Sequence, residues 1–211
     1  MGVRKSIRAV LFDFGGVVAE EGFLEGLRAI GRKNRLDPDQ FFAVADSLIY
    51  ETGYLVGSAR EDVFWNAVRK KTGISGDDAA FRREILSRFV IRPAVLSKVD
   101  VLRSRGFIVA MLSDQTNWLD EIDGKISLFR HFDRVFNSYH IRRSKRDASV
   151  FPHVCAALGV NPEEALFIDD NPKHIERARS MGLRTLHFVS VDDFARQLTT
   201  FVAPYGGEEP A

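Results

Sequence analysis

The chain has 211 residues, of which 45% are hydrophobic and 28% charged, and this composition is typical of a globular protein. The 30 lysines and arginines balance 29 acidic residues, so the net charge is +1 and we expect no nucleic-acid partner. The single cysteine excludes an intrachain disulfide and the usual metal-thiolate patterns. Apolar runs are too short for a signal peptide or a membrane span, so we expect a cytoplasmic protein that does not act at a membrane.

Five short apolar runs predict strands that are buried on both faces, because their apolar residues are continuous rather than alternating. The runs are Ala9–Asp13, Phe107–Ser113, Arg134–Asn137, Ala165–Asp169 and Arg184–Phe188. Helices predicted over 93–105, 148–158 and 172–181 each stop at a glycine shortly before a later run. This alternation predicts βαβ units, and therefore an α/β protein with a Rossmann-like, parallel five-stranded sheet.

The segment 18–91 differs from the rest, because it contains helical patterns and no convincing strand. Asp37-Pro38 predicts a helix N-cap followed by a proline in the first turn, and Ser58–Glu61 resembles a capping box. A connection this long and this helical is typical of a small inserted domain. We therefore expect an α/β catalytic core, 1–17 with 92–211, and an inserted α-helical cap, 18–91.

Two of the predicted strands end in acidic residues. Asp13 ends the first strand, and the adjacent pair Asp169-Asp170 ends the fourth. If these strands are neighbours, the three carboxylates meet at the edge where open α/β sheets bind ligands. Their mutual repulsion would be relieved by a hard divalent cation, and Mg²⁺ accepts carboxylate, water and phosphate oxygens.

Two further polar groups belong to the same edge. Ser113-Asp114 ends the second strand, where the hydroxyl and nearby backbone N–H groups could bind a phosphoryl oxygen. Lys145 precedes a helix and could neutralise a nucleophile and a phosphate together. Each residue alone has a common structural explanation, such as a cap, a turn or a solvated basic loop. Their order around one expected crevice favours a functional site.

These segments resemble the four motifs of the haloacid dehalogenase-like hydrolase superfamily, in its phosphatase type with a helical cap after the first strand. Residues 12–17 match the first motif, 111–113 the second, 145–151 resemble the third and 167–171 the fourth. The resemblance covers essentially the whole core. The cap is similar only in its position and its helical character.

The resemblance implies a phosphatase mechanism. Asp13 would be the nucleophile, forming an aspartyl-phosphate that water then hydrolyses, and Lys145 would assist it. The metal ligands would be Asp13, the backbone carbonyl of Gly15, and Asp169 and/or Asp170. The phosphate-binding residues would be Ser113, Asp114, Gly15 and Lys145. The cap would close over a small phosphorylated substrate, exclude water and set specificity.

Gly15 departs from the family pattern. Phosphatases of the family usually have a second Asp at this position, which protonates the leaving group and activates water. Such a general acid/base contributes about 10²–10⁴-fold to the rate. Either the substrate has a good leaving group, or a nearby carboxylate substitutes; the candidates are Asp114, Glu20 and Glu21.

We therefore predict a Mg²⁺-dependent phosphomonoester hydrolase of a small metabolite or sugar phosphate, acting as a monomer or homodimer. One alternative is a 2-haloacid dehalogenase, which also attacks with the first Asp but needs no metal; the acidic pair 169–170 argues against it. Another is a catalytically weakened phosphate-binding or interaction protein. The five histidines show no metal-ligand spacing, and Tyr50, Tyr54 and Trp65 are interpreted as packing residues more readily than as pocket residues.

Overall fold

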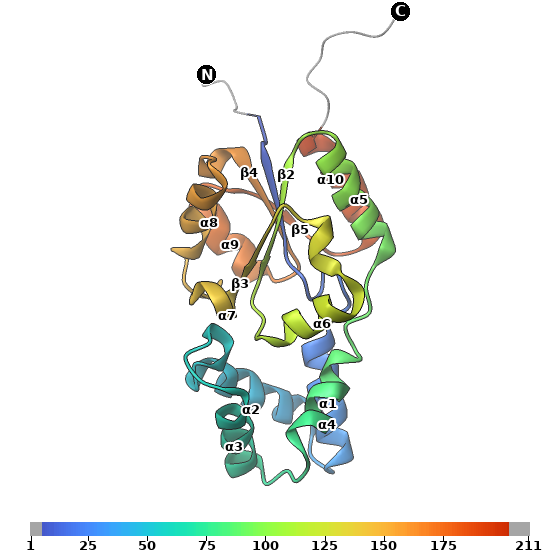
Figure 1. Ribbon diagram of the computed structural model, residues 1–211, viewed down its shortest axis with the longest axis vertical. Coiled ribbons are helices and arrows are strands. Elements are labelled where there is room, and N and C mark those ends of the chain that lie inside the picture. Colours follow the sequence, from blue (N-terminus) through green and yellow to red (C-terminus); the bar gives the residue numbers. More distant parts are fainter. Residues whose placement is uncertain (1–5, 203–211) are drawn as a thin grey trace, which may run out of the picture.

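The apolar runs assemble into one parallel sheet with the strand order β3-β2-β1-β4-β5 (Figure 1). The computed structural model describes residues 6–202 of the chain. The strands are β1 (Ala9–Phe12), β2 (Ile108–Ser113), β3 (Arg134–Asn137), β4 (Ala165–Asp169) and β5 (Arg184–His187). The predicted five-stranded α/β fold is confirmed, and each predicted strand end lies within one residue of the observed one.

The central position of β1 explains why residues far apart in sequence meet. This strand pairs with β2 on one side and β4 on the other, and Phe12 lies opposite both Met111 and Ile168. Asp13 extends the ladder by one bond, because its N–H donates to the Ile168 carbonyl at 2.9 Å. The residues that follow β1, β2 and β4 therefore leave the sheet side by side at its carboxyl edge, as predicted.

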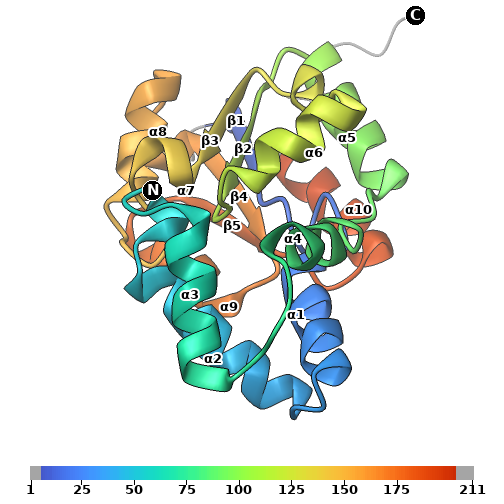
Figure 2. The ribbon, with the colours of Figure 1, turned by 60° about the horizontal axis from the view of Figure 1, so that its bottom comes forward.

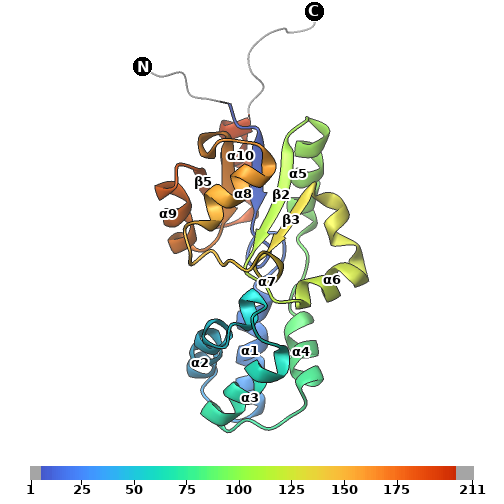
Figure 3. The same ribbon diagram turned by 60° about the vertical axis from the view of Figure 1, so that its left-hand side comes forward.

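Helices cover both faces of the sheet (Figure 3). Alternate residues of β1 belong to two separate apolar clusters: Val10 and Phe12 face α5, α6 and α10, whereas Ala9 and Leu11 face α8 and α9. These helices are α5 (Pro93–Ser104), α6 (Trp118–Ile126), α8 (Val150–Leu158), α9 (Pro172–Ser180) and α10 (Val191–Val202). The sequence predicted α5, α8 and α9 to within two residues, but did not predict α6 or α10.

Short helical turns complete the connections between these elements. They are the 3-10 helices η1 (Tyr54–Val56), η2 (Leu128–His131) and η3 (Pro162–Glu164), and the single-turn α7 (Ser138–Ile141).

Four helices between β1 and α5 gather at the carboxyl edge of the sheet (Figures 1 and 2). They are α1 (Gly22–Lys33), α2 (Pro38–Glu51), α3 (Glu61–Thr72) and α4 (Asp78–Leu86). The predicted N-cap of α2 is confirmed: the Asp37 carboxylate accepts the Gln40 N–H at 2.8 Å, and Pro38 follows it. The predicted capping box at 58–61 is wrong. The N-cap of α3 is Arg60, which makes no side-chain cap bond because it carries no short acceptor.

The apolar residues of α1–α4 join the same buried cluster as one face of the sheet. The contact centres on Trp118 of α6, whose ring centroid lies 5.7 Å from that of Tyr54 and 6.2 Å from that of Trp65. The division into a core and a cap at residues 18–91 stays a prediction, and its outer segments, 1–5 and 203–211, lie outside the described residues.

Between residues 6 and 202, no helix combines the length and the apolar character that crossing a membrane requires.

Candidate active site

The turn after β1 holds Asp13 in a fixed orientation. Its Oδ1 accepts the N–H of Phe14 at 2.7 Å, and its side chain is 11% exposed. Gly16 follows with a φ of +81°, a conformation that favours glycine. Arg92, the N-cap residue of α5, donates to the carbonyls of Val17 and Gly16 and stabilises the turn. Asp13 is therefore presented at the carboxyl edge by a well-bonded loop.

Lys145 lies between two of the predicted acids. Its Nζ is 2.6 Å from Asp13 Oδ2 and 2.7 Å from Asp169 Oδ2, and the side chain is only 1% exposed. Burial alone would lower the pKa of Lys145, but the carboxylates of Asp13, Asp169 and Asp114 raise it above its ordinary value. Lys145 is thus a buried, permanently charged ammonium group in contact with the predicted nucleophile.

Asp114 positions the loop that carries this lysine. Its Oδ1 and Oδ2 accept the Lys145 backbone N–H at 2.9 and 3.1 Å, and the Tyr50 hydroxyl lies 3.4 Å from Oδ2. The carboxylate of Asp114 therefore links the end of β2, the Lys145 loop and helix α2. Burial raises the pKa of Asp114.

Asp169 and Asp170 have different surroundings. The fully buried Asp169 accepts bonds from Lys145 and from the Asn171 N–H at 2.7 Å, and His174 Nδ1 lies 3.3 Å from both its oxygens. Burial would raise the pKa of Asp169, but Lys145 and His174 outweigh it and hold the pKa below its usual range. The Asp170 carboxylate has no hydrogen-bond or ion-pair partner within residues 6–202, and burial and the charge of Asp169 raise its pKa.

Ser113, at the end of β2, is 1% exposed. Its hydroxyl oxygen is buried and has no hydrogen-bond partner in the described part of the chain. Buried polar groups are normally hydrogen-bonded, and an unsatisfied one calls for a missing partner such as a ligand. A phosphoryl oxygen would be such a partner, and the phosphate-binding role of Ser113 stays a prediction.

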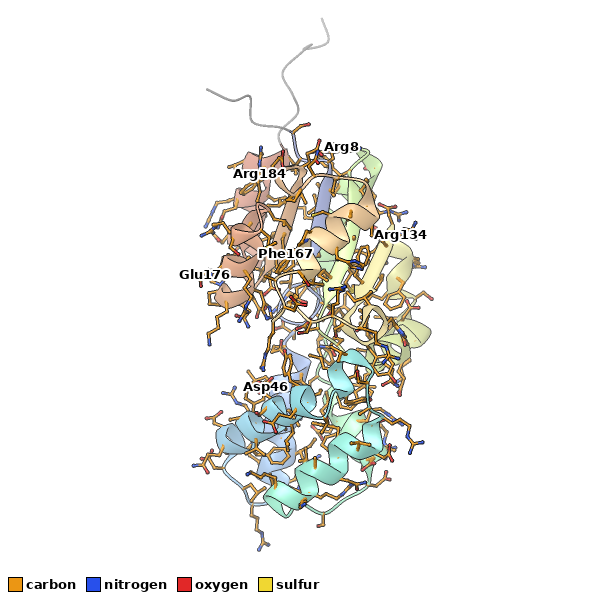
Figure 4. All side chains as sticks on the ribbon, turned by 90° about the vertical axis from the view of Figure 1, so that its left-hand side faces the viewer. Arg8, Asp46, Arg134, Phe167, Glu176 and Arg184 are labelled. Carbon is orange, nitrogen blue, oxygen red and sulfur yellow. The ribbon has the colours of Figure 1, made fainter. Side chains whose placement is uncertain are left out.

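A cavity of about 230 Å³ opens above these residues. We call its sheet side the floor, which consists of Asp13, Gly15, Lys145 and Asp170. We call its helix side the roof, which consists of Phe23, Leu24, Phe42, Ile49, Tyr50 and Leu55. Asp46 of α2, labelled in Figure 4, also lines the cavity, whereas Arg8 and Arg184 mark the opposite end of the sheet. The floor of the cavity is charged, and its roof is mostly apolar.

Most of the predicted site residues meet at this cavity. Five of them line it: Asp13, Gly15, Asp114, Lys145 and Asp170. Ser113 and Asp169 do not line it. The sequence analysis missed several other lining residues: His174, Asn171, Gln115, Thr116 and Trp118. His174 has one sequence signal, its place in the first turn of the helix that follows the acidic pair. Of the three aromatic residues interpreted as packing, Tyr54 and Trp65 are buried, but Tyr50 lines the cavity.

Negative charge is in surplus around the floor. Burial and the charges of Asp169 and Asp170 raise the pKa of Asp13, and Lys145 opposes them. Burial and the charge of Asp170 raise the pKa of Glu21 to about 7. Several carboxyl groups thus share one ammonium group, an arrangement that a divalent cation stabilises.

The chain is similar in sequence to several known proteins. A family profile described as haloacid dehalogenase-like hydrolase matches residues 7–182. The phosphoserine phosphatase of Thermus thermophilus is 29% identical over 206 residues, which cover 85% of this chain and 80% of that protein. Drimenol cyclase drtB of Aspergillus calidoustus is 28% identical over 71% of this chain, but the chain spans only 29% of that protein's length.

A solved structure shows the same fold. The family enzyme bt-2542 of Bacteroides thetaiotaomicron, in complex with magnesium and inorganic phosphate, superposes with a TM-score of 0.68 at 23% identity, over 86% of this chain and 94% of that one. The profile match extends over most of the chain and includes the strand-end residues described above. The chain belongs to the haloacid dehalogenase-like hydrolase family of enzymes.

Proposed function

We propose that this hydrolase is a Mg²⁺-dependent phosphomonoesterase of small phosphorylated molecules, acting through an aspartyl-phosphate on Asp13. The observation that carries the proposal is the buried contact of 2.6 Å between Asp13 and Lys145 at the floor of the cavity. A carboxylate held against an ammonium group can attack phosphorus without repelling the phosphate. The phosphatase name of the Thermus thermophilus relative supports the same reaction.

The residues of the floor divide the chemistry among them. Asp13 attacks phosphorus, forms an O–P bond and displaces the ester oxygen; water then releases phosphate and restores the carboxylate. The ammonium group of Lys145 attracts the phosphoryl oxygens and stays aligned because Asp169 holds it at 2.7 Å. The unpartnered hydroxyl of Ser113 donates to a further phosphoryl oxygen. The roof keeps water away from the phosphoenzyme.

The oxygen atoms of the floor fit a magnesium ion. The Gly15 carbonyl accepts no hydrogen bond within the described chain, and the Asp170 carboxylate is also without a partner there. The Gly15 carbonyl and Asp170 would therefore hold the ion together with Asp13, while Asp169, whose oxygens contact Lys145, Asn171 and His174, would hold Lys145 in place. Bound there, Mg²⁺ supplies charge neutralisation at the phosphoryl group.

A second observation, the unpartnered oxygens of Gly15 and Asp170, favours the phosphatase over the dehalogenase interpretation. A dehalogenase needs only the first Asp and no cation, so it has no use for the free Asp170 carboxylate and the free Gly15 carbonyl. The Gly15 residue is buried and Asp170 is partly buried, and oxygens there that lack a partner among the described residues favour a bound cation and thus the phosphatase.

The test is phosphate release from aryl, acyl, sugar and nucleoside phosphates, with MgCl₂ or with EDTA, for the wild type and Asp13→Asn. We expect release that depends on Mg²⁺ and falls by at least about 10³-fold in Asp13→Asn. Chloride release from 2-chloropropionate without added metal would support the dehalogenase instead. Phosphate binding without turnover of any substrate would support the weakened binding protein.

A further inference from the structure

The floor lacks the proton donor that phosphatases of this family usually carry at position 15. An alkoxide leaves phosphorus slowly unless it is protonated as the bond breaks. Three carboxylates are candidates to replace this proton donor, and two of them already form hydrogen bonds or an ion pair elsewhere. Asp114 binds the backbone N–H of Lys145, and Glu20 is 55% exposed and forms an ion pair with Arg92 at 2.7 Å.

Glu21 is the remaining candidate, and its surroundings are different. It lies at the N-terminus of α1, is partly buried and lines the cavity together with Asp13. Its Oε1 accepts the Leu24 N–H at 3.3 Å. Its other neighbour at the start of the helix is the backbone N–H of Phe23, and the side chain has no ion-pair partner among residues 6–202.

Glu21 Oε2 lies beside the position of the missing side chain. A Cβ built on Gly15 would lie 3.0 Å from Glu21 Oε2, 3.7 Å from Glu21 Cδ and 3.3 Å from Phe89 Cε1. The Glu21 carboxyl group therefore occupies the space next to the backbone of residue 15 that an aspartate there would enter. Glycine at position 15 leaves room for a carboxyl group that arrives from helix α1 instead.

We propose that Glu21 is the general acid and base of this enzyme, an inference that rests on the proposed phosphatase function. As Asp13 forms its bond to phosphorus, the ester P–O bond breaks and the Glu21 carboxyl proton passes to the leaving oxygen, which departs as an alcohol. In the second half-reaction the Glu21 carboxylate takes a proton from the water that attacks the aspartyl-phosphate. The P–O bond to Asp13 breaks, phosphate leaves, and both side chains return to their starting states.

The test uses phosphate esters whose leaving groups differ in basicity: 4-nitrophenyl, phenyl and ethyl phosphate. Glu21→Gln keeps an acceptor for the Leu24 N–H but loses the transferable proton. We expect kcat/KM to fall by about 100-fold or more for ethyl phosphate and by no more than about threefold for 4-nitrophenyl phosphate, which needs little protonation. Phosphorylated Asp13 should also accumulate with 4-nitrophenyl phosphate and appear in the intact mass, because the base of the second step is gone. Glu20→Gln is the matched control, and neither readout should change.

A reciprocal exchange separates catalysis from helix capping. Gly15→Asp alone should not raise activity, because its Cβ meets Glu21 and Phe89. The double variant Glu21→Ala with Gly15→Asp should be at least about tenfold more active on ethyl phosphate than Glu21→Ala alone.

The outcomes distinguish this inference from the proposed function. A wild-type enzyme that releases no phosphate from any ester, or an Asp13→Asn variant with unchanged release, contradicts the proposed function itself. Asp13-dependent release with an equal loss for all three esters in Glu21→Gln, or with no loss, overturns the role of Glu21 alone.

Discussion

The floor and the roof of the cavity are built from different kinds of structure. The floor consists of residues at the ends of β1 and β4 and in the loop before α8, where buried charges contact one another at 2.6 and 2.7 Å. The roof consists of mostly apolar side chains on α1, α2 and η1. Charged contacts in a buried floor tolerate little change, whereas an apolar surface can be exchanged with modest cost. The reaction should therefore depend on the floor and the choice of substrate on the roof.

The largest effect should follow from removing the ammonium group of the floor. Lys145→Met leaves Asp13 and Asp169 buried without their cation, and we expect the free energy of unfolding at pH 7 to fall by about 3–5 kcal/mol. Chemical denaturation in EDTA measures it. Lys173→Met, at an exposed position on α9, should change stability by no more than about 0.5 kcal/mol.

The loss of stability in Lys145→Met should depend on pH. The lowered pKa of Asp169 contributes stability above the ordinary aspartate pKa, and this contribution is lost as the pH falls. The difference between the wild type and Lys145→Met should therefore be full near pH 7 and shrink below about pH 4. A difference that stays constant between these pH values would show that lost packing, not charge, causes it.

An intermediate effect should come from crowding Asp170. A Cβ on Gly16 would lie 2.7 Å from Asp170 Oδ1 and closer still to Oδ2, and Gly16 has a φ of +81°. Gly106 has a φ of +84° but nothing within 4 Å of its Cβ position, so Gly106→Ala measures backbone strain alone. We expect Gly106→Ala to lower the free energy of unfolding by about 1–2 kcal/mol, and Gly16→Ala to lower it further and also weaken Mg²⁺ binding. Denaturation and magnesium titration of both variants measure the difference. Equal behaviour would contradict the placement of Asp170 beside Gly16.

The smallest effect should come from the roof. Phe42→Ala removes part of the apolar surface, and we expect KM for phenyl phosphate to rise about tenfold while kcat changes little. Acetyl phosphate, which has a small leaving group, should show little change in KM. Phe201→Ala on α10, remote from the cavity, should leave both KM values unchanged. A large fall in kcat for acetyl phosphate would show that the roof takes part in the reaction itself.

The same contrast explains what could be predicted from the sequence. Buried parallel strands are continuous apolar runs, so their ends could be located and Asp13, Ser113 and Asp169 assigned to one edge. The roof could not be predicted in the same way. Which faces of α1 and α2 turn toward the sheet depends on how helices pack, and aromatic residues there, such as Tyr50, resemble ordinary core residues. Glu21 could be named from the sequence as one of three candidate carboxylates near Gly15. The sequence could not single it out, because its position beside Gly15 depends on the turn and the helix start that separate them.

Trapping the phosphoenzyme tests most directly whether Asp13 is the nucleophile. The protein is mixed with MgCl₂ and 4-nitrophenyl phosphate, quenched in acid, and mapped by peptide mass spectrometry. We expect one phosphoryl group on the peptide that contains Asp13, and none on that peptide in Asp13→Asn. A phosphoryl group on another residue, or phosphate release that persists in Asp13→Asn, would contradict it.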